Sequence, residues 1–198
     1  MSQFFRSACA AIALVGLAAV AGPAMAADAV VVVDLQRLYG ESVAGKSVQA
    51  QLKAIGDSVQ KELDPEAKAL QTEKDATWAP RFQGKSDQQA SAELEKDPAL
   101  KTKYVAYVQR GNALVQKSQL RRSELQATEQ GAVQAVIEAA SPDVKGAMTA
   151  KGANVVLEKG AVVWASDAVD ITADVLSRFN ARVKTVPVTK VDLTQQQK

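Results

Sequence analysis

The sequence contains no histidine and a single cysteine, Cys9, among its 198 residues. Without histidine there is no imidazole for general acid–base catalysis, no Ser-His or Cys-His nucleophile pair, and no His-ligated metal site. A disulfide within one chain is excluded because it needs two cysteines. Most hydrolase mechanisms are therefore excluded, and we predict no catalytic residues, no metal site and no cofactor.

Aromatic residues and net charge are also scarce. Aromatic residues make up 5% of the chain, which is few for a large conventional core. Lys and Arg number 24 against 22 Asp and Glu, so the formal net charge of +2 creates no strong field that would attract nucleic acid. A hydrophobic share of 47% with 23% charged residues is typical of a folded soluble protein.

The N-terminal segment 1–26 has the pattern of a secretory signal peptide. Arg6 precedes an apolar stretch, Ala8–Ala21, and the small residues Ala24-Met25-Ala26 form a cleavage site. This apolar stretch of 14 residues is shorter than the roughly 20 that a membrane-spanning helix needs, which disfavours an uncleaved anchor. Cleavage would remove Cys9, so the exported chain would depend on packing or assembly for its stability.

The rest of the chain predicts an α+β protein in which a small strand body carries a long helical arm. β-branched runs lie near both ends of the chain, and the section between them is rich in Ala, Gln, Lys, Glu and Leu. Two of the runs are separated by three residues ending in Gly160, which predicts a β-hairpin. The predicted elements are strands 30–34, 154–158 and 161–165, an arm over 46–145 with its tip near 76–99, a helix over 171–183 with Asp170 as N-cap, and a disordered tail over 185–198. The predicted body comprises residues 27–45 and 146–184.

Heptad spacing in the middle section predicts two long helices that pack as an antiparallel hairpin. The first half of the seam comprises Val48, Leu52, Ile55, Val59 and Leu63, and the second half comprises Leu100, Tyr104, Tyr107, Gly111, Leu114, Ser118, Arg121, Leu125, Thr128 and Ala132. Pro65 follows Asp64 inside the first half, so either the helix kinks there or a new helix begins with Asp64 as its cap. Glycines and polar residues dilute the seam, which predicts arms that bend.

Without the arm, about 45 ordered residues remain, a size that is marginal without disulfides, metal or assembly. The first two are excluded by composition. We therefore predict a homo-oligomer in which several chains share one sheet or barrel. The residues predicted to carry this assembly are Val31, Val33, Val155, Leu157, Val162 and Trp164.

The segment Gly40–Ser47 matches the phosphate-binding loop pattern G-x-x-x-x-G-K-[ST]. That loop must follow a strand directly, whereas Leu35–Tyr39 separates the strand from Gly40 and itself has a helical pattern. We therefore interpret Gly40–Ser47 as the capped N-terminus of a helix that matches the motif by chance. The basic pair Arg121-Arg122 is more consistent with a solvated helix face than with an anion site.

The order of these segments resembles the Skp (OmpH) family of periplasmic chaperones. The resemblance rests on the strand Val30-Val31-Val32-Val33-Asp34, the long helical hairpin, the Val155-Val156-Leu157 and Val162-Val163-Trp164 runs, and above all Asp170-Ile171-Thr172-Ala173-Asp174-Val175-Leu176. It implies a jellyfish-like homotrimer in the periplasm whose arms enclose a cavity. It also implies an ATP-independent holdase that binds unfolded outer-membrane β-barrel proteins.

The resemblance also implies two further partners, the outer-membrane assembly machinery and lipopolysaccharide. Familiar members are strongly basic, whereas this chain is near neutral, so we assign no lipopolysaccharide-binding residues. The candidate client-contact residues lie at the arm tip and along the arm: Trp78, Phe82, Leu100, Tyr104 and Tyr107. Trp78 and Phe82 could instead pack against each other. The alternative function is a structural coiled-coil envelope protein with one fixed partner.

Overall fold

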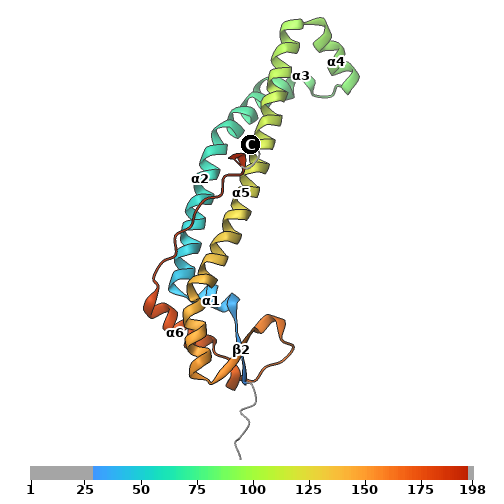
Figure 1. Cartoon of the computed structure of the whole chain (residues 1–198). Coiled ribbons are helices and arrows are strands. Elements are labelled where there is room, and N and C mark those ends of the chain that lie inside the picture. Colours follow the sequence, from blue (N-terminus) through green and yellow to red (C-terminus); the bar gives the residue numbers. More distant parts are fainter. Residues whose placement is uncertain (1–28, 196–198) are drawn as a thin grey trace, which may run out of the picture.

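The computed structural model describes residues 29–195, so the predicted signal peptide, residues 1–26, lies outside the described residues. Two long helices form a hairpin that projects from a small body, as Figure 1 shows. The α+β class, with a small strand body and a helical arm, is confirmed. In the described part of the chain, no helix is both long and apolar enough to cross a membrane.

Two strands from opposite ends of the chain form the sheet of the body. β1 (Ala29–Val33) pairs in parallel with β2 (Ala153–Glu158), with Val31 opposite Val156. On the side of β1, the Ile171 backbone N–H donates to the Val32 carbonyl oxygen at 2.9 Å. The connection between the two parallel strands is the whole arm, which replaces the single helix of an ordinary crossover.

The predicted strand over 161–165, and with it the predicted hairpin, is wrong for the single chain. Lys159–Ala161 form a 3-10 turn that the Val162 N–H closes onto the Lys159 carbonyl, and the following run leaves the sheet. Val163 and Trp164 are then exposed, by 105% and 80%. β propensity expresses packing against a neighbouring strand, and within residues 29–195 this run has no such neighbour.

The segment that matches the phosphate-loop pattern consists of two helix ends. Asp34 caps α1 (Leu35–Glu41), and Ser42 caps α2 (Val43–Glu73) by accepting the Gly45 N–H at 2.9 Å. A Cβ on Gly45 would lie 1.8 Å from the Tyr39 carbonyl oxygen, so glycine is required by the close approach of the two helices. Because no loop separates strand from helix here, the segment offers no cradle for phosphate.

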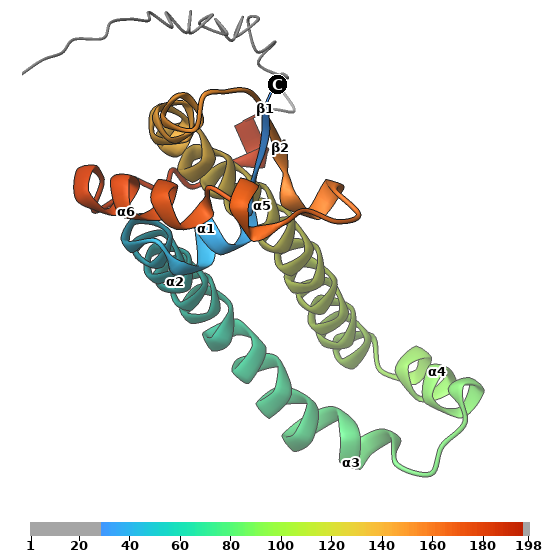
Figure 2. The same cartoon turned by 90° about the horizontal axis from the view of Figure 1, so that it is seen from below.

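The arm consists of α2 and α5 (Pro98–Ala150), joined at the tip by a π-helical turn (Lys74–Trp78), α3 (Ala79–Phe82) and α4 (Asp87–Lys96). Every residue of the predicted heptad seam is buried or half-buried, so the predicted hairpin packing is confirmed. Figure 2 shows the two helices running side by side from the body to the tip. Pro65 lies inside α2, which continues without a new N-cap at Asp64.

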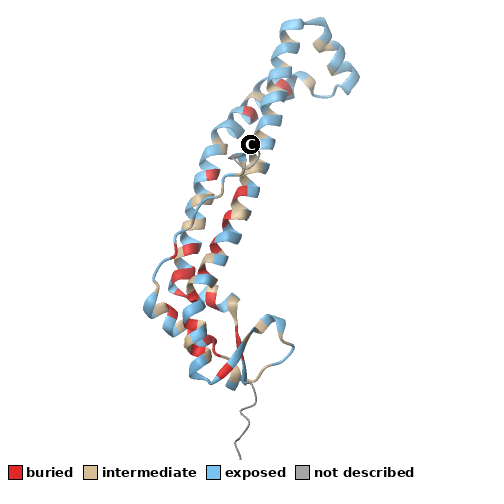
Figure 3. Ribbon diagram, viewed as in Figure 1, coloured by how far each residue is buried: buried red, intermediate tan, exposed pale blue. Residues whose placement is uncertain are grey.

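The C-terminal helix α6 (Thr172–Arg182) closes the base of the arm. Val175 and Phe179 on its inner face are buried, as is Ile171 just before its first residue. Its N-cap is Ile171, one residue later than predicted, although Asp170 Oδ1 still accepts the Thr172 N–H at 2.9 Å. The buried residues gather in the body and the adjacent half of the arm, as Figure 3 shows, whereas the distal arm is mostly exposed.

The prediction of a disordered tail over 185–198 is wrong for its described part. Residues 185–195 run back along the arm in an extended conformation and end in a short 3-10 turn, Leu193–Gln195. Val186 is buried and Val188 packs against the core of the body. The polar composition of the tail concealed alternating apolar residues that pack on the arm.

Candidate functional site

Apart from Val43 at the start of α2, the exposed large apolar residues of the described chain lie at two places, one on the body and one on the arm. The body patch comprises Val30, Val155, Leu157, Val163 and Trp164, all of which are at least 40% exposed. Val155 and Leu157 lie on β2, whose strand neighbour within residues 29–195 is β1 alone. A two-stranded sheet with an apolar outer edge is a ready template for pairing with another chain.

The six predicted assembly residues divide into two groups. Val31 and Val33 are buried inside the chain, where they contribute to its own core, and Val162 is half-buried. Val155, Leu157 and Trp164 are exposed and lie in the body patch. Val163 is fully exposed and also belongs to the body patch. It is not among the six residues predicted from the sequence, although it lies in the same apolar run as Val162 and Trp164.

An ion pair fixes the chain beside the body patch. Lys159 Nζ lies 2.5 Å from Asp170 Oδ2, and the Thr172 hydroxyl donates to Asp170 Oδ1 at 2.5 Å. Burial disfavours the charged form of Asp170, but the hydrogen bonds from Lys159 and Thr172 outweigh it and lower the pKa of this carboxyl to about 2. The turn that carries Val163 and Trp164 is thereby tied to the start of α6.

At the arm tip, the predicted client-contact aromatic residues pack against one another. The Trp78 ring centroid lies 5.1 Å from that of Tyr104 and 5.8 Å from that of Tyr107, and Phe82 stacks on Trp78 at 6.1 Å. Trp78 is only 4% exposed, and its indole N–H donates to Glu73 at 3.1 Å. Of the two roles considered for Trp78 and Phe82, mutual packing is therefore the one present in this structure. Leu100 is half-buried near the start of α5.

The second exposed apolar surface is the arm stripe, which comprises Val105, Val108 and Val115 on α5. The spacing of 3 and 7 residues places the three valines on one face of the helix, next to the seam. They are 38–55% exposed. These valines lie outside the heptad positions, so the stripe was not among the client-contact residues predicted from the sequence. Its signal was the presence of valines at solvent-facing helix positions, where polar residues are the usual choice.

Ion pairs connect α2 and α5 across the arm. Glu62 Oε1 lies 2.9 Å from Arg121 Nη2 and 3.0 Å from Lys117 Nζ, and these hydrogen bonds lower the pKa of Glu62 to about 2. Arg121 also contacts the buried Glu124 at 2.8 Å, which with the Glu62 hydrogen bond raises the pKa of its guanidinium. Because both sides of Arg121 are occupied by carboxylates, it is not available to an anionic ligand.

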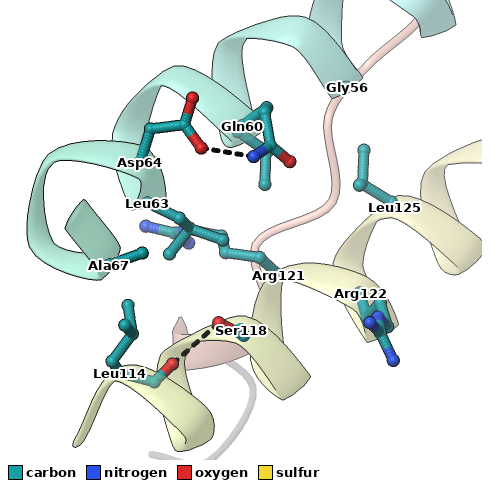
Figure 4. A pocket seen from close by; sticks show the side chains of 11 residues that line it. Gly56, Gln60, Leu63, Asp64, Ala67, Leu114, Ser118, Arg121, Arg122 and Leu125 are labelled. Atoms are coloured by element: carbon teal, nitrogen blue, oxygen red, sulfur yellow. Dashed lines mark hydrogen bonds between the residues drawn. The ribbon is translucent and has the colours of Figure 1, made fainter. Parts of the chain in front are cut away.

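Beside these ion pairs, the two arm helices leave a groove of about 320 Å³. Figure 4 shows Leu63 and Ala67 of α2 facing Leu114 and Leu125 of α5 across it, with Arg121 between them. Gly56 adds space because no heavy atom lies within 4 Å of the position that a Cβ would occupy. The seam is therefore loosely packed at mid-arm, where small residues replace large ones.

Comparisons with known proteins agree with the arrangement of body and arm. The family model "Outer membrane protein (OmpH-like)" matches residues 29–179. Among solved structures, the chain is similar to one from Caulobacter crescentus CB15, described as a "putative outer membrane chaperone (OmpH-like)". The two are 32% identical with a TM-score of 0.69, over 88% of this chain and 96% of the other. No curated protein sequence gives a significant match.

Proposed function

The chain belongs to the OmpH-like outer membrane protein family, and from this premise we propose that it is an ATP-independent holdase of the periplasm. Its clients would be unfolded outer-membrane β-barrel proteins, which it would keep soluble until they insert into the membrane. The observation that carries the proposal is the arm stripe. Val105, Val108 and Val115 are exposed on a projecting helix, where they have no role in the core.

The chemistry of the clients suits such a surface. A strand of a transmembrane barrel alternates apolar and polar residues, and in water its apolar side chains and unpaired backbone groups promote aggregation. Three exposed valines offer contacts that are weak individually and add up when several arms hold one client. A client leaves when membrane insertion buries more of its apolar surface, so no nucleotide is needed.

Assembly is the second part of the proposal. Within residues 29–195 the sheet has two strands, and this short sheet together with the exposed Trp164 supports a homotrimer in which the body patches of three chains cover one another. Three arms would then project from one body and enclose a cavity. The seam packing of α2 on α5 is satisfied within one chain, which leaves the arm stripe free for clients.

Light scattering on the purified mature protein, with and without a urea-diluted outer-membrane protein, tests both parts. We expect a mass near three chains and a soluble complex without nucleotide. A monomer that leaves the client to precipitate would overturn the proposal. Strict dependence on one folded partner, with no capture of unrelated denatured porins, would favour a structural envelope protein instead.

A further inference from the structure

The C-terminal segment 185–193 is bound to the arm as one extended strand binds another. The side-chain amide of Gln51 donates to the Val186 carbonyl oxygen at 2.8 Å and accepts the Val188 N–H at 3.1 Å. A neighbouring β-strand forms the same pair of bonds with alternate residues. On the surface of α2, the Gln51 side-chain amide therefore provides the donor and the acceptor that a neighbouring strand would provide.

Two buried side chains of α5 continue this recognition farther along the arm. The Thr128 hydroxyl accepts the Val191 N–H at 2.9 Å, and Glu124 Oε1 accepts the Leu193 N–H at 3.3 Å. Thr128 and Glu124 are 1% and 0% exposed beneath the segment. Both are held by the arm itself, because the Thr128 hydroxyl donates to the Glu124 carbonyl oxygen at 2.6 Å and Glu124 Oε2 accepts from Arg121 at 2.8 Å. These four contacts are made to backbone atoms of the segment, so they do not depend on which side chains the segment carries. A fifth contact, between the Ser47 and Thr185 hydroxyls at 2.9 Å, involves a side chain of the segment.

The side chains of the segment alternate in exposure. Val186 is buried and Val188, Val191 and Leu193 are half-buried, whereas Pro187, Thr189, Lys190 and Asp192 are exposed. The two pairs Val186/Val188 and Val191/Leu193 each have the period of two that a strand requires. Backbone recognition together with alternating apolar residues is the chemistry of a barrel strand.

We propose that the surface formed by Gln51, Thr128 and Glu124 is a binding site for extended peptide segments with alternating apolar residues. Segment 185–193 of the same chain occupies this site as an intramolecular competitor. This proposal rests on the proposed function, because that function identifies the external segment as part of an unfolded barrel protein. The match to the family model ends at residue 179, before this segment begins.

Competition follows from the short connection between the segment and the body. The segment begins three residues after α6 ends at Arg182, so its effective concentration at the site is about millimolar or higher. A single weak peptide cannot displace it at micromolar concentration. A long unfolded chain can, because its many segments bind elsewhere on the arms at the same time.

The first test measures binding of a fluorescein-labelled peptide of residues 184–194 by fluorescence anisotropy to the purified full-length mature protein. Val186→Asp with Val188→Asp should release the segment and strengthen peptide binding about tenfold or more relative to the wild type. The matched control, Thr189→Asp with Lys190→Ser, makes the same change in charge at exposed positions and should bind like the wild type. Equal binding by all three proteins, with unchanged circular dichroism, would overturn the proposal.

A second change examines the site itself. In the released variant, Gln51→Leu removes the two backbone contacts and should weaken peptide binding about tenfold. Gln71→Leu, an exposed position on the same helix, is the control and should have no effect. If Gln51→Leu leaves the affinity unchanged, the peptide binds elsewhere and the proposal fails.

Hydrogen exchange on the unmodified protein covers the case in which the released variant does not fold. Excess unfolded outer-membrane protein, diluted from urea, should accelerate exchange of the Val188, Val191 and Leu193 amides, because its many segments together displace the bound segment. Unchanged exchange in a complex that contains the captured chain would show that the segment is a permanent strap, which overturns the proposal. Capture of a denatured porin by the wild type is measured separately, so loss of peptide competition and loss of chaperone activity are distinguishable.

Discussion

Glu62 of α2 and Arg121 of α5 form a two-point ion pair across the middle of the arm. Arg121 Nε lies 3.0 Å from Glu62 Oε2, and Arg121 Nη2 lies 2.9 Å from Glu62 Oε1. The planar guanidinium matches the carboxylate in this geometry, which gives directional contact as well as attraction. The pair lies beside the groove of about 320 Å³ that the two helices leave at mid-arm.

Changing Glu62 to Gln should loosen the middle of the arm without unfolding the body. Exposed ion pairs contribute little to global stability, so we expect the midpoint of unfolding to change only slightly. Hydrogen exchange of α2 and α5 near residues 60–67 and 114–125 should nevertheless increase. Glu66→Gln, at an exposed position one turn away, is the control and should leave exchange unchanged. Equal exchange in both variants would show that the ion pair does not hold the helices together.

Leu157→Asp and Val105→Asp form a matched pair, because both side chains are 44% exposed and lie on different surfaces. Leu157→Asp should give monomer or unfolded protein, since it places a charge in the body patch that assembly would bury. Val105→Asp should leave the trimer mass unchanged. Sedimentation or light scattering measures both, and a trimer of unchanged stability in the Leu157 variant would contradict the shared body.

Replacing Val105, Val108 and Val115 together by Asp should weaken client retention while the trimer persists. The change removes the exposed apolar area of the arm stripe, each valine contributing up to roughly 1 kcal/mol of contact at its partial exposure. Turbidity after dilution of a urea-denatured porin measures the loss. The control replaces Lys103, Arg122 and Lys145 by Ser, which makes the same change in charge at exposed positions on α5 outside the stripe. Full suppression of aggregation by the stripe variant would show that clients bind elsewhere.

The two tryptophans report on opposite ends of the molecule. Trp78 is buried among tyrosines at the tip, whereas Trp164 is 80% exposed in the single chain and lies in the body patch. In a Trp78→Phe variant the remaining fluorescence comes from Trp164, and assembly should shift its emission to shorter wavelength as the indole becomes buried. Dilution below the dissociation constant of the trimer should reverse the shift. Emission typical of exposed indole at every concentration would contradict burial of the body patch.

The pKa of Asp170 predicts how the body responds to acid. Its pKa is about 2 in the folded chain, whereas an unperturbed aspartate carboxyl has a pKa of 3.8, so the unfolded state binds more protons between these values. Its contribution to stability is complete above about pH 4 and is lost as the pH falls toward 2. Because the carboxyl is partly exposed, we expect this contribution to be on the order of 1 kcal/mol. Urea unfolding at several pH values measures it, and Asp170→Asn should flatten the dependence in this range. An identical pH dependence in the wild type and the variant would contradict the assignment.

Much of the arm could be predicted because its signal is periodic and local. The steps of 3 and 4 from Val48 to Leu63 place these residues on one face of a helix whatever the rest of the chain does, and α2 buries that face. The same holds for the inner face of α6, where Val175 and Phe179 lie four residues apart. The antiparallel packing followed from the predicted tip near 76–99, which separates the two seams.

The structure of the body and the tail could not be read in this way. The run at Val162–Trp164 has β-branched and aromatic residues, but strand formation needs a neighbour, which the isolated chain does not supply within residues 29–195. The tail was predicted to be disordered because it contains Pro187 and three successive glutamines. Its two pairs of apolar residues are out of phase by one position, between Val188 and Val191, so they form no continuous strand pattern. Its contacts to Gln51 and Thr128 join residues more than 60 positions apart, and no local pattern reveals them.

The parallel pairing of β1 with β2 has a consequence for the order of folding. Val31 and its partner Val156 are 125 positions apart, and the arm occupies most of the chain between them. A chain that emerges from its amino end therefore exposes β1 long before its partner strand exists. The arm hairpin, whose contacts begin at its own tip, can form first and bring the two ends together, so closing the long loop costs less entropy. The arm is in this respect also the folding template of the body.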